Sequence, residues 1–524
     1  MVVQNPLPVL RFGKRGWILA SALVAALIVG ALVCLALHWP FTRTAVTELL
    51  EEGSSSKVEF GSFRGTYFPH PGCVAERVVV HQGNRTDLPP LITIQKLTVQ
   101  SNLVAMLRKH ATMVQADGMQ ISIPRQSEHK FQSSSDMVID TFIANDAILK
   151  FERGTGSKPL EFKIHEGELH NLGAHAATHF RLRLNNPKPP GEIEASGTFG
   201  PWLTGHAGQT RVSGQYTFSR ADLGTFRGIA GILFSEGRFD GTLDHIAIQG
   251  STDTRDFTVT SSSHKVDLKN QFSALVNGTN GDVSLQRVDG LLRRTKIFGK
   301  GDIETSEGKA GRTAIFDLCS KYGRIQDLFL LFVTSANSPI SGMTNFCAHI
   351  TIPPGKRHFL KKVELVGDFG VVDSNFSEPE TQQNVNKLSA EAEGADDHKP
   401  AAAVLSSLRG HVEIKAGTAQ FSKLSFGIPG ALAQMHGTYN LLSHQIDLHG
   451  TLKLDSSPSH MAHGPKALLM KFMDPFFKKK QGSEVPVKIT GTYEKPSFGL
   501  DLNGHKQTSA SKRLQRLYQK PRTH

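Results

Sequence analysis

The sequence predicts a mainly β protein, with one N-terminal transmembrane helix followed by a long antiparallel sheet of repeated hairpins and a few short helices. Three observations predict this fold class. A single uncharged apolar run lies near the N-terminus, and from about residue 57 onward apolar and polar residues alternate over many short stretches. Turn residues, including many of the 49 glycines, separate these stretches. Strands spaced by roughly 8 to 12 residues with turns between them are typical of successive hairpins.

The membrane anchor is predicted at residues 17–39, WILASALVAALIVGALVCLALHW. About 20 apolar residues in a helix span the hydrocarbon core of a bilayer. Trp17 and Trp39 bracket the run, where indole rings favour the two interfaces, and basic residues without acidic ones precede it (Arg11, Lys14 and Arg15). Residues 1–16 are therefore expected in the cytoplasm and the remainder on the far side. A cleaved signal peptide is the alternative, but the run is longer than such segments and lacks their cleavage pattern.

The composition indicates that the chain beyond the anchor faces water. Hydrophobic residues make up 39% of the 524 positions, and the mean hydropathy is −0.22. A net charge of +12 on an exported chain favours anionic membrane surfaces over nucleic acid, and no nucleic-acid partner is expected. The spacing of Cys319 and Cys347 permits a disulfide without demanding one, and small buried residues are the favoured interpretation.

Several alternating stretches supply candidates for an apolar lining. A short helix is expected at 42–52, before the first strands. Period two gives one apolar and one polar face per strand, which suits either several sandwiches or one large sheet. Glycine motifs such as Gly214-Gln215-Tyr216, Gly437-Thr438-Tyr439 and Gly299-Lys300-Gly301 are interpreted as turns. The candidate lining residues are Ile92, Ile94, Ile121, Ile123, Ile246, Ile248, Val412, Ile414, Ile446, Leu448, Val487 and Ile489.

Two segments differ from the β pattern. Residues 377–403 are polar and acidic and are expected to form a linker or surface loop. Residues 505–524 form a basic tail, either an amphipathic helix that contacts a membrane surface or a solvated end. The tail's candidate contact residues are Lys512, Arg513, Arg516 and Lys520. The expected organisation is therefore 1–16 cytoplasmic, 17–39 anchor, 40–124 N-terminal β region, 125–376 central β region, 377–403 linker, 404–504 C-terminal β domain and 505–524 tail.

No motif for catalysis or cofactor binding is found. The densest histidine group, around 165–179, lacks the glutamate of a zincin motif, and its glycines argue against a helix. There is no nucleophile elbow and no phosphate-binding loop of the required spacing. We therefore expect no enzyme activity, no metal site and no cofactor.

Three parts of the sequence resemble the AsmA family of inner-membrane-anchored proteins. They are KVEFGSFRGTYFPHPGCVAERVVVHQ near the N-terminus, GRIQDLFLLFVTSANSPISGMTNFCAHITIPPGKRHFLKKVELVGDFGV in the middle, and LRGHVEIKAGTAQFSKLSFGIPGALAQMHGTYNLLSHQIDLHGTL with VPVKITGTYEKPSFGLDL near the end. The resemblance implies one long curved, groove-like sheet in the bacterial periplasm, anchored in the inner membrane.

The function implied by the resemblance is non-enzymatic. Such a protein would conduct phospholipid along an apolar groove toward the outer membrane and support outer-membrane homeostasis. Its partners would be the inner membrane, phospholipid, and the outer membrane or a partner protein on that side. The alternative is a periplasmic scaffold that regulates the targeting and assembly of outer-membrane proteins without carrying lipid.

Overall fold

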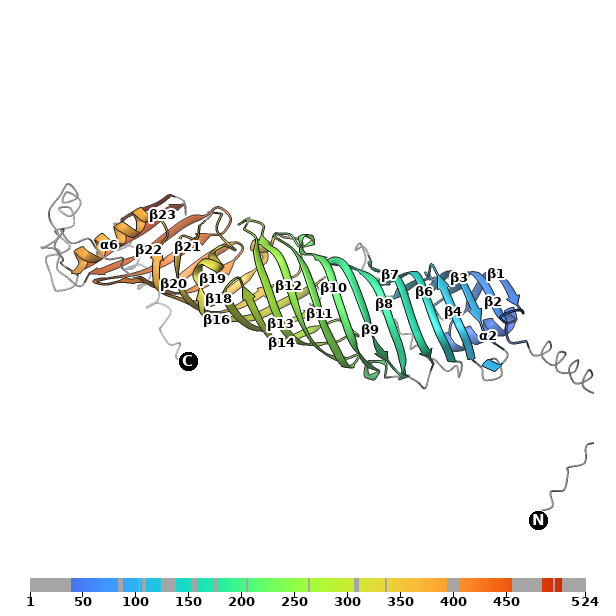
Figure 1. Ribbon diagram of the computed structural model, residues 1–524. Helices are drawn as coiled ribbons and strands as arrows, with labels where there is room; N and C mark the ends of the chain where they lie inside the picture. The colour runs from blue at the N-terminus through green and yellow to red at the C-terminus, as the bar shows by residue number, and fades with distance from the viewer. Residues whose placement is uncertain are drawn as a thin grey trace, which may run out of the picture. The chain divides into compact units, whose positions relative to one another are not determined.

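The computed structural model describes residues 39–82, 88–102, 104–105, 110–123, 138–151, 159–173, 177–203, 206–262, 264–305, 311–334, 337–393, 406–454, 483–492 and 495–501. Over these ranges the chain is mainly β, with 24 strands and a few short helices, so the predicted mainly β class is confirmed (Figure 1). No helix within them is both long and apolar enough to cross a membrane. The predicted anchor, apart from Trp39, and the basic tail lie outside the described residues.

The chain divides into two compact units: residues 1–151 with 166–178, and residues 152–165 with 179–524. Unit 1 contains α2 (Arg43–Ser54), β1 (Val58–Thr66), β2 (Gly72–Val80), β3 (Ile92–Gln100), β4 (His110–Asp117), β5 (Gln120–Ile123) and β6 (Val138–Phe151). Strand β7 (Leu160–Leu172) contributes residues to both units, and β8 (Thr178–Pro187) lies almost wholly in unit 2.

Unit 1 is not wholly antiparallel, and here the prediction was wrong. Strands β1, β2 and β3 pair antiparallel, as do β3 with β4 and β5, but β6 runs parallel to both β4 and β5. Asp117 on β4 links the parallel pair, because its carboxylate accepts 2.9 Å hydrogen bonds from Gln115 and from Asn145 on β6. These two bonds hold the pKa of Asp117 below its usual value. A parallel partner requires a crossover, which periodicity within single strands does not reveal.

Helix α2 covers the apolar face of this sheet. Thr42 caps the helix by accepting a hydrogen bond from the Ala45 amide, and Val46 packs against the buried strand residues Phe60 and Val78. The helix expected at 42–52 is thus confirmed. Its apolar residues follow helical spacing, so burying one stripe on the sheet stabilises both elements.

Strand β3 changes the phase of its inward-facing residues along its length. Ile94 pairs with Val78 and Leu97 pairs with Ala75, so residues of opposite parity reach the same core. The change of phase occurs where Arg77 of β2 adopts a left-handed φ of 52°. An irregularity of this kind shifts which side chains face inward without ending the strand.

Unit 2 is built around one continuous antiparallel sheet in which each strand from β9 to β24 pairs with the next. Within this unit, a single large sheet is therefore present rather than several sandwiches. Its strands are β9 (Pro190–Phe199), β10 (Arg211–Asp222), β11 (Ile229–Thr242), β12 (His245–Val259), β13 (Val266–Val276), β14 (Val283–Leu292), β15 (Thr295–Thr305), β16 (Arg312–Arg324), β17 (Ile340–Ile352), β18 (Glu364–Phe376), β19 (Ser406–Lys415), β20 (Thr418–Ile428), β21 (Ala431–Asn440), β22 (Gln445–Leu454), β23 (Ser483–Thr492) and β24 (Lys495–Leu500).

Bulges recur on alternate strands of this sheet. The register shifts on β10, β12, β14, β16, β18 and β20, and at each shift except the one on β14 a residue has a left-handed φ between 51° and 57°. These residues are Arg220, Asp256, Tyr322, Asp373 and Lys423. Because a bulge adds a residue to one strand of a pair, it bends that strand and increases the local twist.

Short helices pack onto parts of the unit 2 sheet: η1 (Ala207–Gln209), η2 (Leu223–Thr225), α4 (Ile325–Phe329), α5 (Phe359–Lys362) and α6 (Pro379–Glu393). Helix α6 occupies much of the segment expected to be a linker or loop. Its Val385 packs against Ile428, and the buried Ser389 hydroxyl donates a 2.9 Å hydrogen bond to the Pro429 carbonyl. A polar helix is thus ordered by contacts distant in sequence.

Cys319 and Cys347 form a disulfide between β16 and β17. The two residues are directly paired in the register, with their Cα atoms 4.1 Å apart. The sequence interpretation as small buried residues was wrong, because the pairing emerges only when the register of the two strands is known. Cys73 remains a free thiol whose burial raises its pKa to about 11.

Replacing both cysteines of the pair (Cys319→Ser with Cys347→Ser) should lower the free energy of unfolding by about 3 kcal/mol, because the crosslink restricts the unfolded chain. Denaturant unfolding with and without reductant measures this effect. Reductant should destabilise the parent protein and leave the double variant unchanged. Equal unfolding midpoints for parent and variant under oxidising conditions would contradict the prediction.

Candidate functional site

One face of the unit 2 sheet carries an apolar surface that crosses most of its strands. Directly paired residues on antiparallel strands point to the same side, so the register traces a single face from strand to strand. We call this the apolar face, and its central line runs through Phe239, Ile248, Ala274, Leu285, Gly301, Phe316, Ile350, Leu365, Ile414, Ala419, Tyr439 and Ile446.

Most of the large side chains on this line are half-buried. Ile248, Phe316 and Ile414 are neither enclosed like core residues nor fully exposed. Enclosed packing occurs locally, for example where Leu360 of α5 packs near Ile414. In contrast, a core residue of unit 1 such as Val78 is only 1% exposed. A broad apolar surface that stays partly accessible is typical of a binding surface.

Glycines on the apolar face lie beneath aromatic rings. A Cβ atom at Gly237 would lie 2.9 Å from Cε1 of Tyr216, and one at Gly250 would lie 3.1 Å from Cζ of Phe272. Tyr216 is a cross-strand neighbour of Gly237, and Phe272 is one of Gly250. The rings therefore occupy the space that side chains at these glycines would fill, and they cover the backbone with apolar surface.

This arrangement corrects the interpretation of the glycine motifs as turns. Gly214 lies inside β10, Gly437 inside β21, and Gly299 and Gly301 inside β15. Sequence reasoning missed the aromatic contribution from residues such as Tyr216 and Phe316 because it searched for paired aliphatic residues. The spacing of a glycine two positions before an aromatic residue, as in Gly214-Gln215-Tyr216, was the available signal.

The structure brings together the unit 2 members of the predicted lining. Ile246, Ile248, Val412, Ile414, Ile446, Leu448, Val487 and Ile489 share the apolar face and are half-buried. In unit 1, Ile92 and Ile94 instead pack against the core beneath α2, and Ile121 lies directly opposite Ile92. Ile123 ends β5, and its side chain lies outside the described residues. So do Trp17, Lys512, Arg513, Arg516 and Lys520.

The opposite, polar face of unit 2 carries histidine–carboxylate pairs. Nδ1 of His349 lies 2.7 Å from Asp317, and Nδ1 of His411 lies 2.9 Å from Asp368. His449 contacts both Asp501, at 2.7 Å, and Asp447, at 3.0 Å. The hydrogen bond to Asp501, followed by that to Asp447, raises the pKa of His449 against the opposing effect of burial. No group of metal-ligating geometry occurs among the residues that the structure describes.

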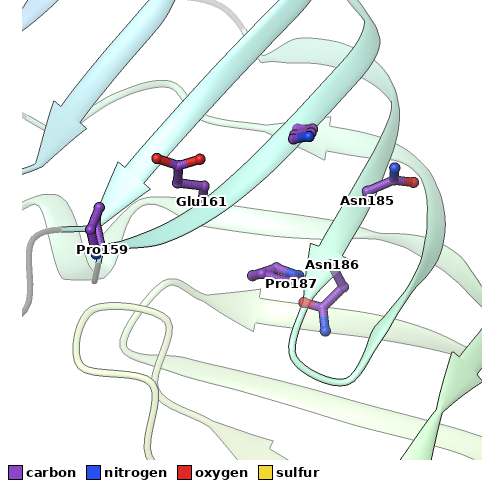
Figure 2. A pocket seen from close by; sticks show the side chains of 6 residues that line it. Pro159, Glu161, Asn185, Asn186 and Pro187 are labelled. Carbon is purple, nitrogen blue, oxygen red and sulfur yellow. The ribbon is translucent and has the colours of Figure 1, made fainter. Parts of the chain in front are cut away.

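A recess of about 570 Å³ lies between β7 and the end of β8 (Figure 2). It is lined by Pro159, Glu161, Lys163, Asn185, Asn186 and Pro187. Asn186 is committed to its turn, because its amide nitrogen donates a 2.7 Å hydrogen bond to the Pro189 carbonyl. This lining contains no nucleophile with an adjacent base and no pair of carboxylates, so it offers no arrangement for acid–base or nucleophilic catalysis.

No protein-family model matches the chain, and no curated protein or solved structure is significantly similar to it.

The His449 contacts predict a pH-dependent contribution to stability. Because the folded-state pKa is raised, the protonated imidazole stabilises the fold fully below the unfolded value of about 6.5, and this contribution is lost as pH rises through the raised pKa. His449→Asn should reduce the decline in stability over that interval. The measurement is the denaturation midpoint from pH 5.5 to 8.5, with His206→Asn as the control. An unchanged profile for His449→Asn would refute the assignment.

Proposed function

We propose that this chain is a non-enzymatic, membrane-anchored protein of a bacterial cell envelope that conducts phospholipid toward the outer membrane. The observation that carries the proposal is the half-buried apolar face of unit 2, which continues across successive strands from β11 to β22. Acyl chains are the ligand this surface suits best, since it offers length and apolarity without a catalytic group. The resemblance to the AsmA family favours the same function, with the sheet curved into a groove.

The energetics favour such a surface for lipid transfer. A diacyl lipid in water exposes roughly 30 methylene groups at ~0.8 kcal/mol each, a cost above ~20 kcal/mol. An apolar face removes much of that exposure while leaving the headgroup in water. Because no bond is made or broken, the protein needs only a continuous surface, which is what repeated strands supply.

An aromatic cluster at the start of unit 1 supports attachment to the membrane. Trp39, the last residue of the uncharged run, lies with its ring centroid 4.8 Å from that of Tyr67. Tyr67 and Phe68 in the β1–β2 turn are 69% and 92% exposed. Aromatic rings of this kind favour the bilayer interface. The Cys319–Cys347 disulfide further favours an oxidising compartment such as the periplasm for unit 2.

Photocrosslinking tests lipid contact with neighbouring positions as controls. A photoreactive residue at position 248 or 414 lies on the apolar face, whereas one at 247 or 413 lies on the polar face one residue away. In cells, we expect lipid adducts at Ile248 and Ile414 and none at Ala247 and Glu413. Adducts at none of these positions, with protein adducts instead, would favour the scaffold for outer-membrane protein assembly.

A charge on the apolar face should impair lipid contact more than folding. Ile248→Asp places a carboxylate in the proposed path at a half-buried site, so the free energy of unfolding should fall by only about 1 kcal/mol. Val78→Asp in the closed core should cost more than ~3 kcal/mol because the charge is buried without a partner. Denaturant unfolding measures the free energy of unfolding of each variant, and lipid adducts at position 414 measure whether lipid still reaches the apolar face. If Ile248→Asp unfolds as readily as Val78→Asp, position 248 is ordinary core.

A further inference from the structure

A group of basic side chains gathers in unit 2 from three segments that are distant in sequence. Lys188 lies in the β8–β9 turn, Arg227 follows η2, and the β17–β18 connection supplies Lys356, Arg357 and Lys362. We call these five residues the cation cluster. Local charge patterning does not predict it, because the three segments lie up to 174 positions apart, from Lys188 to Lys362.

Backbone and ring contacts hold the three segments together. The Phe359 amide donates a 3.0 Å hydrogen bond to the Arg227 carbonyl, and the Arg227 guanidinium donates one of 3.4 Å to the Lys356 carbonyl. The Lys188 ammonium lies 5.5 Å from the centroid of the Phe226 ring. The positions of the basic residues therefore follow from the fold rather than from chance contacts of long side chains.

The cation cluster has no acidic partner among the residues that the structure describes. None of its five residues forms an ion pair in the described ranges, although the polar face elsewhere pairs Lys269 with Asp253 and Lys453 with Glu484. Lys362 is half-buried, and its pKa is lowered first by burial and then by repulsion from Lys188 and Arg357. Gathering like charges without a counter-charge costs free energy, which a bound anion would recover.

The cluster adjoins the apolar face. Phe359 and Leu360, within the same connection as Arg357 and Lys362, pack with Val259 and with Ile414. Ile414 belongs to the central line of the apolar face. A ligand with an anionic group on the cation cluster could therefore lay an acyl chain against the half-buried residues beside it.

We propose that the cation cluster binds the phosphate of an anionic phospholipid headgroup while the acyl chains lie on the apolar face. The lipid part of this inference rests on the proposed function, whereas the anion site stands on the cluster itself. Lysine ammonium and arginine guanidinium groups are suited to phosphate oxygens, the arginine through paired hydrogen bonds. Zwitterionic lipids, whose own cation competes for the phosphate, should bind more weakly.

Calorimetric titration of the full chain in a nonionic detergent tests the proposal with three probes: dihexanoylphosphatidylglycerol, dihexanoylphosphatidylcholine and inorganic phosphate. The test variant carries Lys188→Gln, Arg357→Gln and Lys362→Gln. The control removes the same charge from the polar face through Lys269→Gln, Lys296→Gln and Lys300→Gln. The test variant should bind the phosphatidylglycerol at least about tenfold more weakly, and the control should stay within about twofold of the parent. The single variant Lys188→Gln provides the comparison if the triple variant is poorly folded.

The outcomes separate the two proposals. Unchanged phosphatidylglycerol binding by both test variants would overturn the headgroup site, and lipid adducts at positions 248 and 414 would still support conduction. Inorganic phosphate that binds the parent as tightly as the phosphatidylglycerol would overturn the lipid assignment in favour of a free-phosphate site. If no lipid adducts form at positions 248 and 414 but phosphate binding still depends on the cation cluster, the proposed function is contradicted and the anion site is supported.

Discussion

Cross-strand register is the constraint on which the rest of the structure depends. Backbone hydrogen bonds between antiparallel neighbours place directly paired side chains on the same side, so one apolar strand face fixes the next. In unit 2 this relation carries the apolar face from Phe239 to Ile446 through pairs such as Ile248 with Ala274 and Leu365 with Ile414. A slip of one residue would turn an entire strand to the polar face. Continuity of the surface is therefore a property of the backbone pairing.

The two faces of the unit 2 sheet differ in their side-chain chemistry. On the polar face, side chains such as Asp317 and His349 pair with each other across two adjacent strands. The apolar face leaves large side chains half-buried, and rings such as Tyr216 cover the backbone where glycines such as Gly237 leave it bare. Closed packing occurs in unit 1 beneath α2, and in unit 2 at the contacts of α5 and α6 and around Leu424, Ala433 and Met435 on β20 and β21.

The alternation of apolar and polar residues predicted features that depend on residues close in sequence. It did not predict features that depend on contacts between residues far apart in sequence. Alternation identified the β class and placed Ile248, Ile414 and Ile446 on one surface. It could not detect that β6 is parallel, that Cys319 faces Cys347, or that contacts with Ile428 and Pro429 order α6. Glycines were interpreted as turns because a turn is their commonest use, whereas Gly214 and Gly437 meet rings or carbonyl groups across a ladder. The cation cluster was missed because Lys188, Arg227 and Lys362 meet only in the folded chain.

The bulges on alternate strands make a hairpin, rather than a strand, the unit by which this sheet can change length. Arg220, Asp256, Tyr322, Asp373 and Lys423 each mark the shift within one strand of such a pair. Insertion or loss of two strands together preserves strand direction, the identity of the faces and the alternation of bulges. Insertion or loss of a single strand would reverse the direction of every strand that follows it. Duplication of hairpins is thus a route by which a sheet of this design could lengthen.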